Sequence, residues 1–298
     1  MKRIYYIAFV LTFGVIASCK KEVDTDNFPY ETASYQNEVA AIYDDANSLM
    51  TFFTEATPDT PCGIVEILDS ADLFKKTFVF SGLSCNGKLN RSGRIHLQLQ
   101  NASDWYTTGA ELKITFENFA LTTIAGSGES LVINGSRMVT NLSGATLLEE
   151  LTPGGPGIQR QFTAQNMSIT YPNGTQRIWN ESQLMTSFKN PDWEFEFLLE
   201  GNATGLPYSN IGNWGVDRKG ENYYTEFNEA LTAKLCGGIW KQSGGKTTIY
   251  HTESPATMIE FGVDSEGNPS SEACFAYGIN VIWTDEEGIV HVTTRPYF

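Results

Sequence analysis

Residues 94–99 read Arg-Ile-His-Leu-Gln-Leu, and residues 111–116 read Glu-Leu-Lys-Ile-Thr-Phe. In both stretches every second side chain is apolar, which is the period of a β-strand with one face on a core and the other in water. Further short runs of this kind recur along the chain, separated by residues typical of tight turns. The sequence therefore predicts an all-β fold, a large antiparallel curved sheet arranged as a sandwich or an open barrel. The expected strands are 63–68, 76–81, 94–99, 111–116, 129–133, 136–140, 162–171, 175–179, 194–199, 223–233, 247–250, 258–261, 279–283 and 290–294.

Glycine and proline mark the connections between these strands. Pro172-Asn173-Gly174 and Ser243-Gly244-Gly245 predict hairpin turns, because glycine and asparagine accept the positive φ that such turns need. Asn134-Gly135 is either a hairpin turn or a bulge in one long strand over 129–141. Thr152–Gly157 is a loop or hinge. It leaves open whether the β domain, residues 57–298, is one unit or two similar halves divided near 152–157.

One stretch has a helical period. Between residues 35 and 53 apolar side chains recur at helical spacing, while Asp44, Asp45 and Asn47 occupy the opposite face. Two prolines, Pro58 and Pro61, follow. Residues 35–56 are therefore expected to form an N-terminal helix that packs on the β domain, with partner binding or a membrane-lying role as the alternative.

The amino end has the pattern of a secretion signal. Two positive charges at Lys2 and Arg3 precede an apolar run over 4–17, which is too short to cross a bilayer. Ala17-Ser18-Cys19 resembles the lipobox of bacterial lipoproteins, in which the cysteine takes a diacylglycerol. Residues 1–18 are thus expected to be a lipoprotein signal peptide, Cys19 the lipidation site and 19–34 a lipidated tether. Several acyl chains on Cys19 would anchor the protein stably to the membrane. The alternative is an ordinary secretory signal with a chance cysteine.

Four further cysteines, Cys62, Cys85, Cys236 and Cys274, form an even set in an exported chain, which favours disulfides. Three pairings are compatible with four cysteines. The favoured one is local, Cys62 with Cys85 and Cys236 with Cys274, because each pair brackets a strand-turn-strand unit. A zinc site is the rival interpretation, and the lack of a close Cys-x-x-Cys or a nearby histidine pair argues against it.

The chain also resembles a group of uncharacterised Bacteroidetes surface lipoproteins. The residues that carry the resemblance are the strand and cysteine over 77–85, Arg91–Ile95, Leu112–Phe119, Leu235-Cys236, and Ile259–Gly262 with the later Cys274. The acidic stretch over 20–26 is similar to the export signal of such proteins. The resemblance implies an outer-membrane, cell-surface address, with a periplasm-facing position as the alternative, and it implies no activity. Here residues 263–273 separate the late glycine from Cys274, unlike the group's pattern.

The composition restricts the partners. With 20 basic and 35 acidic residues the net charge is −15, and a domain this acidic repels nucleic-acid backbones. Nucleotide-binding loops, nucleophile elbows and zinc-protease motifs are missing from the sequence. No catalytic, cofactor or metal residue is therefore predicted. The histidines His96, His251 and His291 are interpreted as polar-face strand residues, and Asp264–Asn268 as an acidic surface turn rather than a calcium loop.

Three functions remain open. The favoured one is a non-enzymatic envelope lipoprotein, binding or structural in role, whose partner is a glycan, a lipid or a protein. Six tryptophans leave room for a stacking surface, and Tyr208 and Trp214 in the Gly- and Asn-rich stretch 207–222 are the candidates. The second is a surface glycan hydrolase using paired carboxylates such as Glu194 and Glu196. The third is a carrier of hydrophobic ligands, with the helix closing a cavity inside a curved sheet.

Overall fold

The computed structural model describes residues 46, 49–50, 52–54, 62–69, 71–84, 87, 89–124, 130–144, 153, 157–190, 192, 194–204, 209–236 and 239–297. Its strands form one antiparallel sheet, which confirms the all-β prediction. Each strand pairs with its successor in sequence, except that β8 pairs with β10, while β9 pairs with β7 and β10. The strands are β1 (Ile64–Leu68), β2 (Lys75–Leu83), β3 (Leu89–Leu99), β4 (Ala110–Thr123), β5 (Ser130–Asn141), β6 (Ile158–Thr170), β7 (Gln176–Lys189), β8 (Phe195–Gly201), β9 (Ile211–Val216), β10 (Asn222–Cys236), β11 (Ile239–His251), β12 (Thr257–Val263), β13 (Gly278–Thr284) and β14 (Val290–Pro296).

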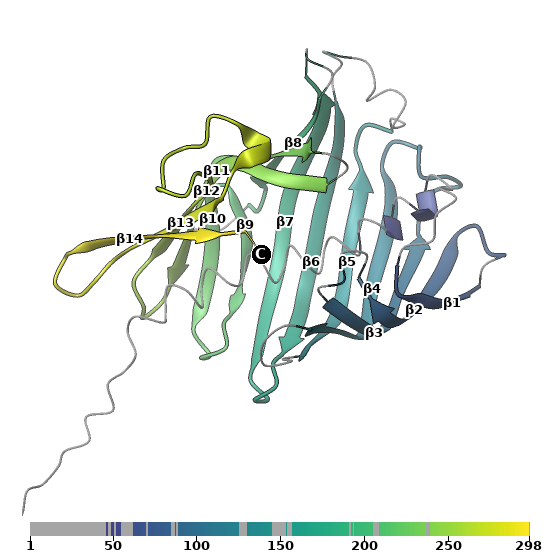
Figure 1. Cartoon of the computed structure of the whole chain (residues 1–298). Helices are drawn as coiled ribbons and strands as arrows, with labels where there is room; N and C mark the ends of the chain where they lie inside the picture. Colours follow the sequence, from purple (N-terminus) through teal and green to yellow (C-terminus); the bar gives the residue numbers. More distant parts are fainter. Residues whose placement is uncertain are drawn as a thin grey trace, which may run out of the picture.

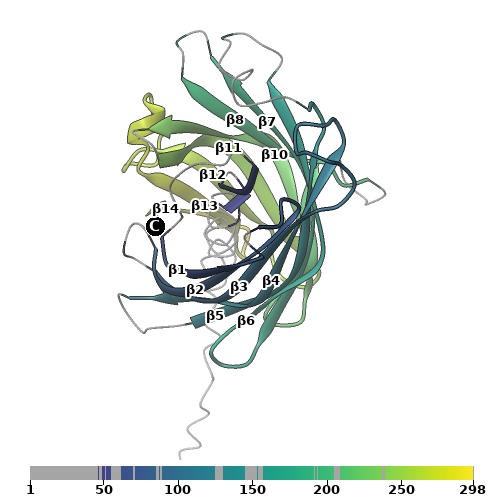
Figure 2. The same ribbon diagram turned by 90° about the vertical axis from the view of Figure 1, so that its right-hand side faces the viewer.

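The sheet is curved and open. Figures 1 and 2 show its wall bending round from β1 to β14, and these two end strands are not neighbours in the strand order. A band of bulges crosses β3 to β6, where the register shifts at Ser92/Arg94, Phe116/Phe119, Asn134/Ser136 and Ala164/Met167. Bulges bend a strand and increase its twist. Their alignment across adjacent strands accounts for the curvature.

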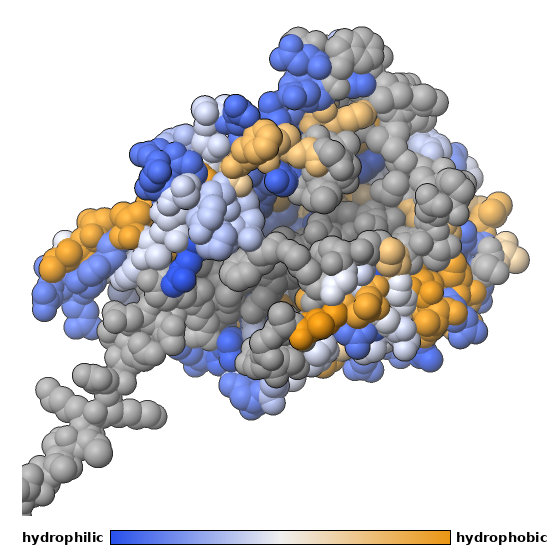
Figure 3. All heavy atoms as spheres, in the orientation of Figure 1, coloured by the Kyte–Doolittle hydropathy of each residue, from blue (hydrophilic) through white to orange (hydrophobic). Residues whose placement is uncertain are grey.

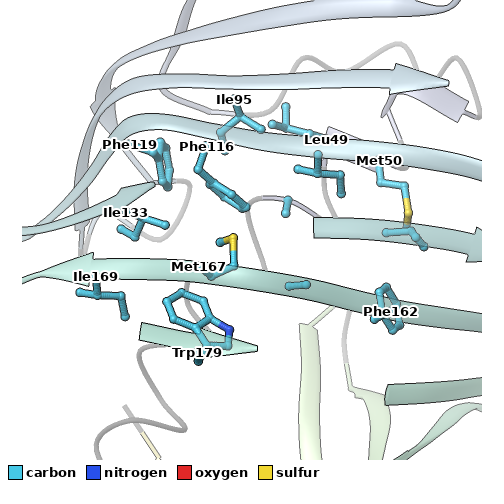
Figure 4. Close-up of a cluster of buried hydrophobic side chains, with 14 of the residues drawn as sticks. Leu49, Met50, Ile95, Phe116, Phe119, Ile133, Phe162, Met167, Ile169 and Trp179 are labelled. Carbon is cyan, nitrogen blue, oxygen red and sulfur yellow. The ribbon is translucent and has the colours of Figure 1, made fainter. Parts of the chain in front are cut away.

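The core lies on the concave face. Every second side chain of the long strands points there, and the apolar ones form one buried cluster that extends from β2 to β13. Figure 4 shows part of it, including Ile95, Phe116, Phe119 and Met167. Ala46, Leu49 and Met50, which are helical, belong to the same cluster. Phe52 and Phe53, also helical, pack against this cluster and are partly buried. The other residues of the expected helix, apart from Thr54, lie outside the described residues.

Buried arginines interrupt the apolar face, and each packs over an aromatic ring. Arg91 lies 5.2 Å from the ring centroid of Phe80, and Arg137 lies 4.0 Å from that of Phe162. Cation–π contacts of this kind are stronger when water is excluded. Charged side chains can therefore remain inside the curved sheet.

The structure confirms some of the predicted turns and contradicts others. The turn at 172–174 is confirmed, since the Gly174 N–H donates to the Tyr171 carbonyl at 2.9 Å. The hairpin at 243–245 is wrong, because these residues lie inside β11 at a bulge opposite β10. Asn134-Gly135 is a bulge within β5, as the second alternative stated. Strands β5 and β6, which precede and follow residues 152–157 in the sequence, pair directly, so the sheet is continuous between them.

The described cysteines Cys62, Cys236 and Cys274 are all disulfide-bonded. Cys236 at the end of β10 is bonded to Cys274 in the short 3-10 helix η1 (Ala273–Phe275). Cys62 is disulfide-bonded as well, and Cys85 lies outside the described residues. In the part of the chain that the structure describes, no helix has the length and apolar character needed to cross a bilayer.

Candidate functional site

Three aromatic side chains line up across the convex face of the sheet. Tyr224 of β10 stands opposite Trp214 of β9 on one side and Tyr250 of β11 on the other. The rings of Tyr224 and Tyr250 stack at 4.8 Å between centroids. Their sequence neighbours Tyr223 and Ile249 are buried in the core, and successive strand residues point to opposite faces. Trp214, Tyr224 and Tyr250, here called the aromatic ladder, therefore face outward and are half-buried.

Polar groups border the ladder. The carboxylate of Glu226 accepts hydrogen bonds from the Tyr250 hydroxyl at 3.1 Å and from the Asn228 amide at 3.2 Å. Asn228 in turn accepts the Thr248 hydroxyl at 2.6 Å. Aromatic rings next to hydrogen-bonding side chains on a stiff sheet suit a ligand that has both apolar faces and hydroxyl groups.

The predictions for the two candidate stacking residues, Trp214 and Tyr208, had different outcomes. Trp214 lies in the ladder, but as a strand residue rather than in an exposed loop, because 211–216 form β9. Tyr208 lies outside the described residues. Trp105 and Trp179 are buried in the core. Tyr224 and Tyr250 were not predicted from the sequence, although their alternation with core-facing residues such as Tyr223 and Ile249 was an available signal.

A second polar feature on the convex face is a shallow hollow of about 280 Å³ at the bulges of β3 and β4, lined by Val79, Gly93, Arg94, Glu117 and Asn118. Glu117 accepts hydrogen bonds from His96 at 3.0 Å and Arg94 at 3.4 Å. These two partners lower the pKa of Glu117. The carboxylate is thus ionised and engaged, which suits a structural ion pair better than proton transfer.

Glu194 and Glu196, the carboxylates considered for glycan hydrolysis, share one cation. Lys234 Nζ lies 3.1 Å from Glu194 and 2.9 Å from Glu196. Hydrogen bonds from Asn190 and Lys234 lower the pKa of Glu194. A glycosidase acid needs a pKa raised by its surroundings. Glu194 therefore lacks the raised pKa of a hydrolytic acid.

The three histidines have different environments. His96 faces the convex surface beside Glu117, as the polar-face interpretation predicts. The interpretation is wrong for His251, whose side chain is fully buried on the concave side beside Asp217 and Glu221. His291 stacks on Trp283 at 5.1 Å and lies 2.7 Å from Asp285.

Asp264 uses one carboxylate oxygen to accept the backbone N–H groups of Glu266 and Asn268, so the stretch 264–268 is a capped turn. These bonds lower the pKa of Asp264, with the contact to Asn268 the largest cause.

No protein-family model, curated protein or solved structure matches this chain.

Proposed function

We propose that this chain is a lipid-anchored protein of the bacterial outer membrane, displayed at the cell surface, that binds a glycan on its aromatic ladder without altering it chemically. The ladder carries the proposal. It combines the Tyr224–Tyr250 stack with the adjacent Trp214 on three hydrogen-bonded strands. The lipobox-like Ala17-Ser18-Cys19 supports the anchor.

Sugar rings have apolar C–H faces and polar hydroxyl edges, and the ladder offers a complementary surface for each. Aromatic rings present a large rigid area at little entropic cost because they have few rotatable bonds. Glu226 and Asn228 place carboxylate and amide groups next to the rings, where sugar hydroxyls can exchange for the existing hydrogen bonds. Strands β9 to β11 hold these groups in fixed register, so little ordering is needed on binding.

The competing functions have weaker support. The hydrolase hypothesis named Glu194 and Glu196, and Lys234 contacts both carboxylates. The carrier hypothesis needs room on the concave face, where Leu49 and Met50 are buried against the sheet. Binding at the convex face conflicts with neither observation.

Glycan binding is tested with the full-length protein in detergent, on an array of bacterial and host polysaccharides followed by calorimetry. Trp214→Ala is expected to weaken binding of the best glycan about tenfold, which is about 1.4 kcal/mol. Tyr277→Ala is the matched control, because Tyr277 is exposed but lies outside the ladder. An array without binders, or equal weakening by both variants, would overturn the proposal.

The anchor is tested separately in the native host. Cys19→Ser is expected to give a protein that keeps its precursor mass and is not acylated, because the thiol that would carry the diacylglycerol is gone. If the variant is still processed normally and sediments with outer membranes, the anchoring part of the proposal is wrong, whatever the array shows.

A further inference from the structure

Three hairpin turns of this protein share the sequence pattern Asp-x-x-Gly-x, beginning at Asp217, Asp264 and Asp285. In each turn the aspartate Oδ1 accepts the backbone N–H groups two and four residues later, in hydrogen bonds that are 2.8–3.0 Å long. One carboxylate oxygen therefore closes the turn. The other, Oδ2, is available for a further contact.

The surroundings of the second carboxylate oxygen, Oδ2, differ between the turns that begin at Asp285 and Asp217. Asp285 Oδ2 lies 2.7 Å from His291 Nε2, an ordinary hydrogen-bond distance, on a partly exposed hairpin. Asp217 Oδ2 is buried and makes no hydrogen bond to the described residues. Its neighbour is His251 Nδ1 at 3.4 Å, and the two side chains are only 1% and 0% exposed. A buried carboxylate oxygen without a hydrogen bond is unfavourable unless a cation compensates it.

Glu221 adds a second carboxylate from the same turn. Its Oε2 lies 4.0 Å from His251 Nδ1, and its side chain is 17% exposed. One ligand atom from each of Asp217, Glu221 and His251 lies within 4.8 Å of the other two. Two carboxylates converge on one imidazole, so a protonated imidazole would balance only one of the two negative charges.

The separations of 3.4 Å between His251 and Asp217 and 4.0 Å between His251 and Glu221 suit ligands placed around one ion. Zinc binds nitrogen and oxygen at about 2.0–2.2 Å, so neighbouring tetrahedral ligands lie about 3.4 Å apart. We propose that Asp217, Glu221 and His251 bind one divalent transition-metal ion, with zinc the best match and water completing the coordination. Mixed nitrogen and oxygen ligands without sulfur are compatible with this class of ion.

The groups around the three ligands hold them in place. Backbone N–H groups of Lys219 and Glu221 fix Asp217 through Oδ1, which leaves Oδ2 directed at the site. The Ser254 hydroxyl lies 3.0 Å from both oxygens of Glu221. Contacts of this kind orient metal ligands and are part of a functional site. The ion would connect the β9–β10 turn to the end of β11.

The test uses full-length protein in detergent, stripped with a chelator and then titrated with Zn²⁺ by calorimetry and elemental analysis. The wild type is expected to bind one equivalent. His251→Gln and Glu221→Gln are expected to bind about a hundredfold more weakly or not at all. His291→Gln is the matched control, because it alters a histidine beside the same kind of turn, and it should bind like the wild type.

Circular dichroism establishes that each variant is folded. Glu221→Gln preserves the shape of a partly exposed side chain. Its zinc affinity therefore tests the proposed site even if His251→Gln fails to fold. Co²⁺ in place of Zn²⁺ should give visible bands of a nitrogen–oxygen site, without the near-ultraviolet band of a thiolate ligand. Failure of the wild type to bind a stoichiometric ion, or full binding by Glu221→Gln, would overturn the proposal. Trp214→Ala, which removes a ladder residue on the opposite face, should leave zinc binding unchanged.

Discussion

The guanidinium of Arg137 and the carboxylate of Glu181 lie 2.7 Å apart on the concave face, with side chains that are 3% and 0% exposed. They belong to β5 and β7, and both stand opposite Ala164 of the intervening strand β6. The small side chain of Ala164 leaves space for the two charged groups to meet above it. Phe162 supplies the ring under the guanidinium. The sheet thus encloses a complete ion pair within its apolar core.

Removing one member of this pair should destabilise the fold strongly. Glu181→Ala is expected to lower the free energy of unfolding by about 3–5 kcal/mol, because Arg137 keeps a buried charge that has lost this carboxylate. Arg137→Met combined with Glu181→Leu should recover most of that loss. Urea denaturation followed by circular dichroism measures both. A single variant as stable as the double variant would show that the pair does not behave as a buried unit.

The exposed pair of Arg94 and Glu117 provides the contrast. Its groups lie 3.4 Å apart with half-exposed side chains, and exposed ion pairs contribute little. Arg94→Ala should therefore leave the denaturation curve nearly unchanged.

The band of bulges depends on glycine at one close approach of two strands. Gly93 has a φ of +93°, and a Cβ placed there would lie 2.1 Å from the Asn118 carbonyl oxygen. Gly93→Ala should cost about 1–2 kcal/mol for the backbone conformation and about 1–3 kcal/mol more for the clash. Gly174→Ala is the control, since its φ is +81° but a Cβ there meets open space. Equal thermal denaturation midpoints for the two variants would contradict the steric argument.

The alternation of residues 94–99 and 111–116 predicted one part each of β3 and β4 and the face that these side chains occupy, but not the continuation of both strands beyond their bulges. It failed for β9, because Gly212 and Gly215 interrupt the pattern. Both sites need glycine, since a Cβ would lie 2.1 Å from the Phe227 ring and 2.0 Å from the Ile178 carbonyl oxygen, respectively. Such contacts join residues far apart in sequence, and a local pattern does not contain them.

For the candidate sites, too, the local sequence pattern shows which face a residue occupies but not which distant residues it meets. Thr247, Ile249 and His251 are alternate residues of one strand, so their side chains point to the same face. Thr247 and Ile249 are buried in the core, so the alternation around the apolar Ile249 was a signal that His251 faces the core. The meeting of His251 with Asp217 depends instead on strand order, which brings β11 beside β10 and the β9–β10 turn. Likewise, the ladder exists only because Trp214, Tyr224 and Tyr250 share a register across three strands.

The disulfide between Cys236 and Cys274 should contribute measurably to stability. The two cysteines are 38 residues apart, and closing a loop of this size restricts the unfolded chain by about 2–4 kcal/mol. Replacing both with alanine should lower the free energy of unfolding by that amount. Urea denaturation under non-reducing conditions measures it. A double variant as stable as the wild type would mean that η1 docks against β10 and β11 without the covalent bond.

Tyr297 should make the protein sensitive to alkali. The Gly262 N–H donates to its hydroxyl oxygen at 2.8 Å, and burial raises the pKa of Tyr297 to about 12 from a usual value of 10.0. Because the folded state holds the phenol proton more tightly, this stabilisation is complete below pH 10 and is lost as pH rises through 12. The loss amounts to about 2–3 kcal/mol at most, since one pKa unit corresponds to about 1.4 kcal/mol.

Tyr297→Phe isolates this contribution. Near pH 8 the variant should be less stable by about 1 kcal/mol, because the Gly262 N–H loses its acceptor. Between pH 10 and pH 12 that difference should shrink and then reverse, because phenylalanine has no proton to lose. Every other residue is the same in the two proteins, so its contribution cancels in the comparison. Urea denaturation at a series of pH values gives the two curves, and curves that stay parallel up to pH 12 would show that ionisation of Tyr297 does not oppose folding.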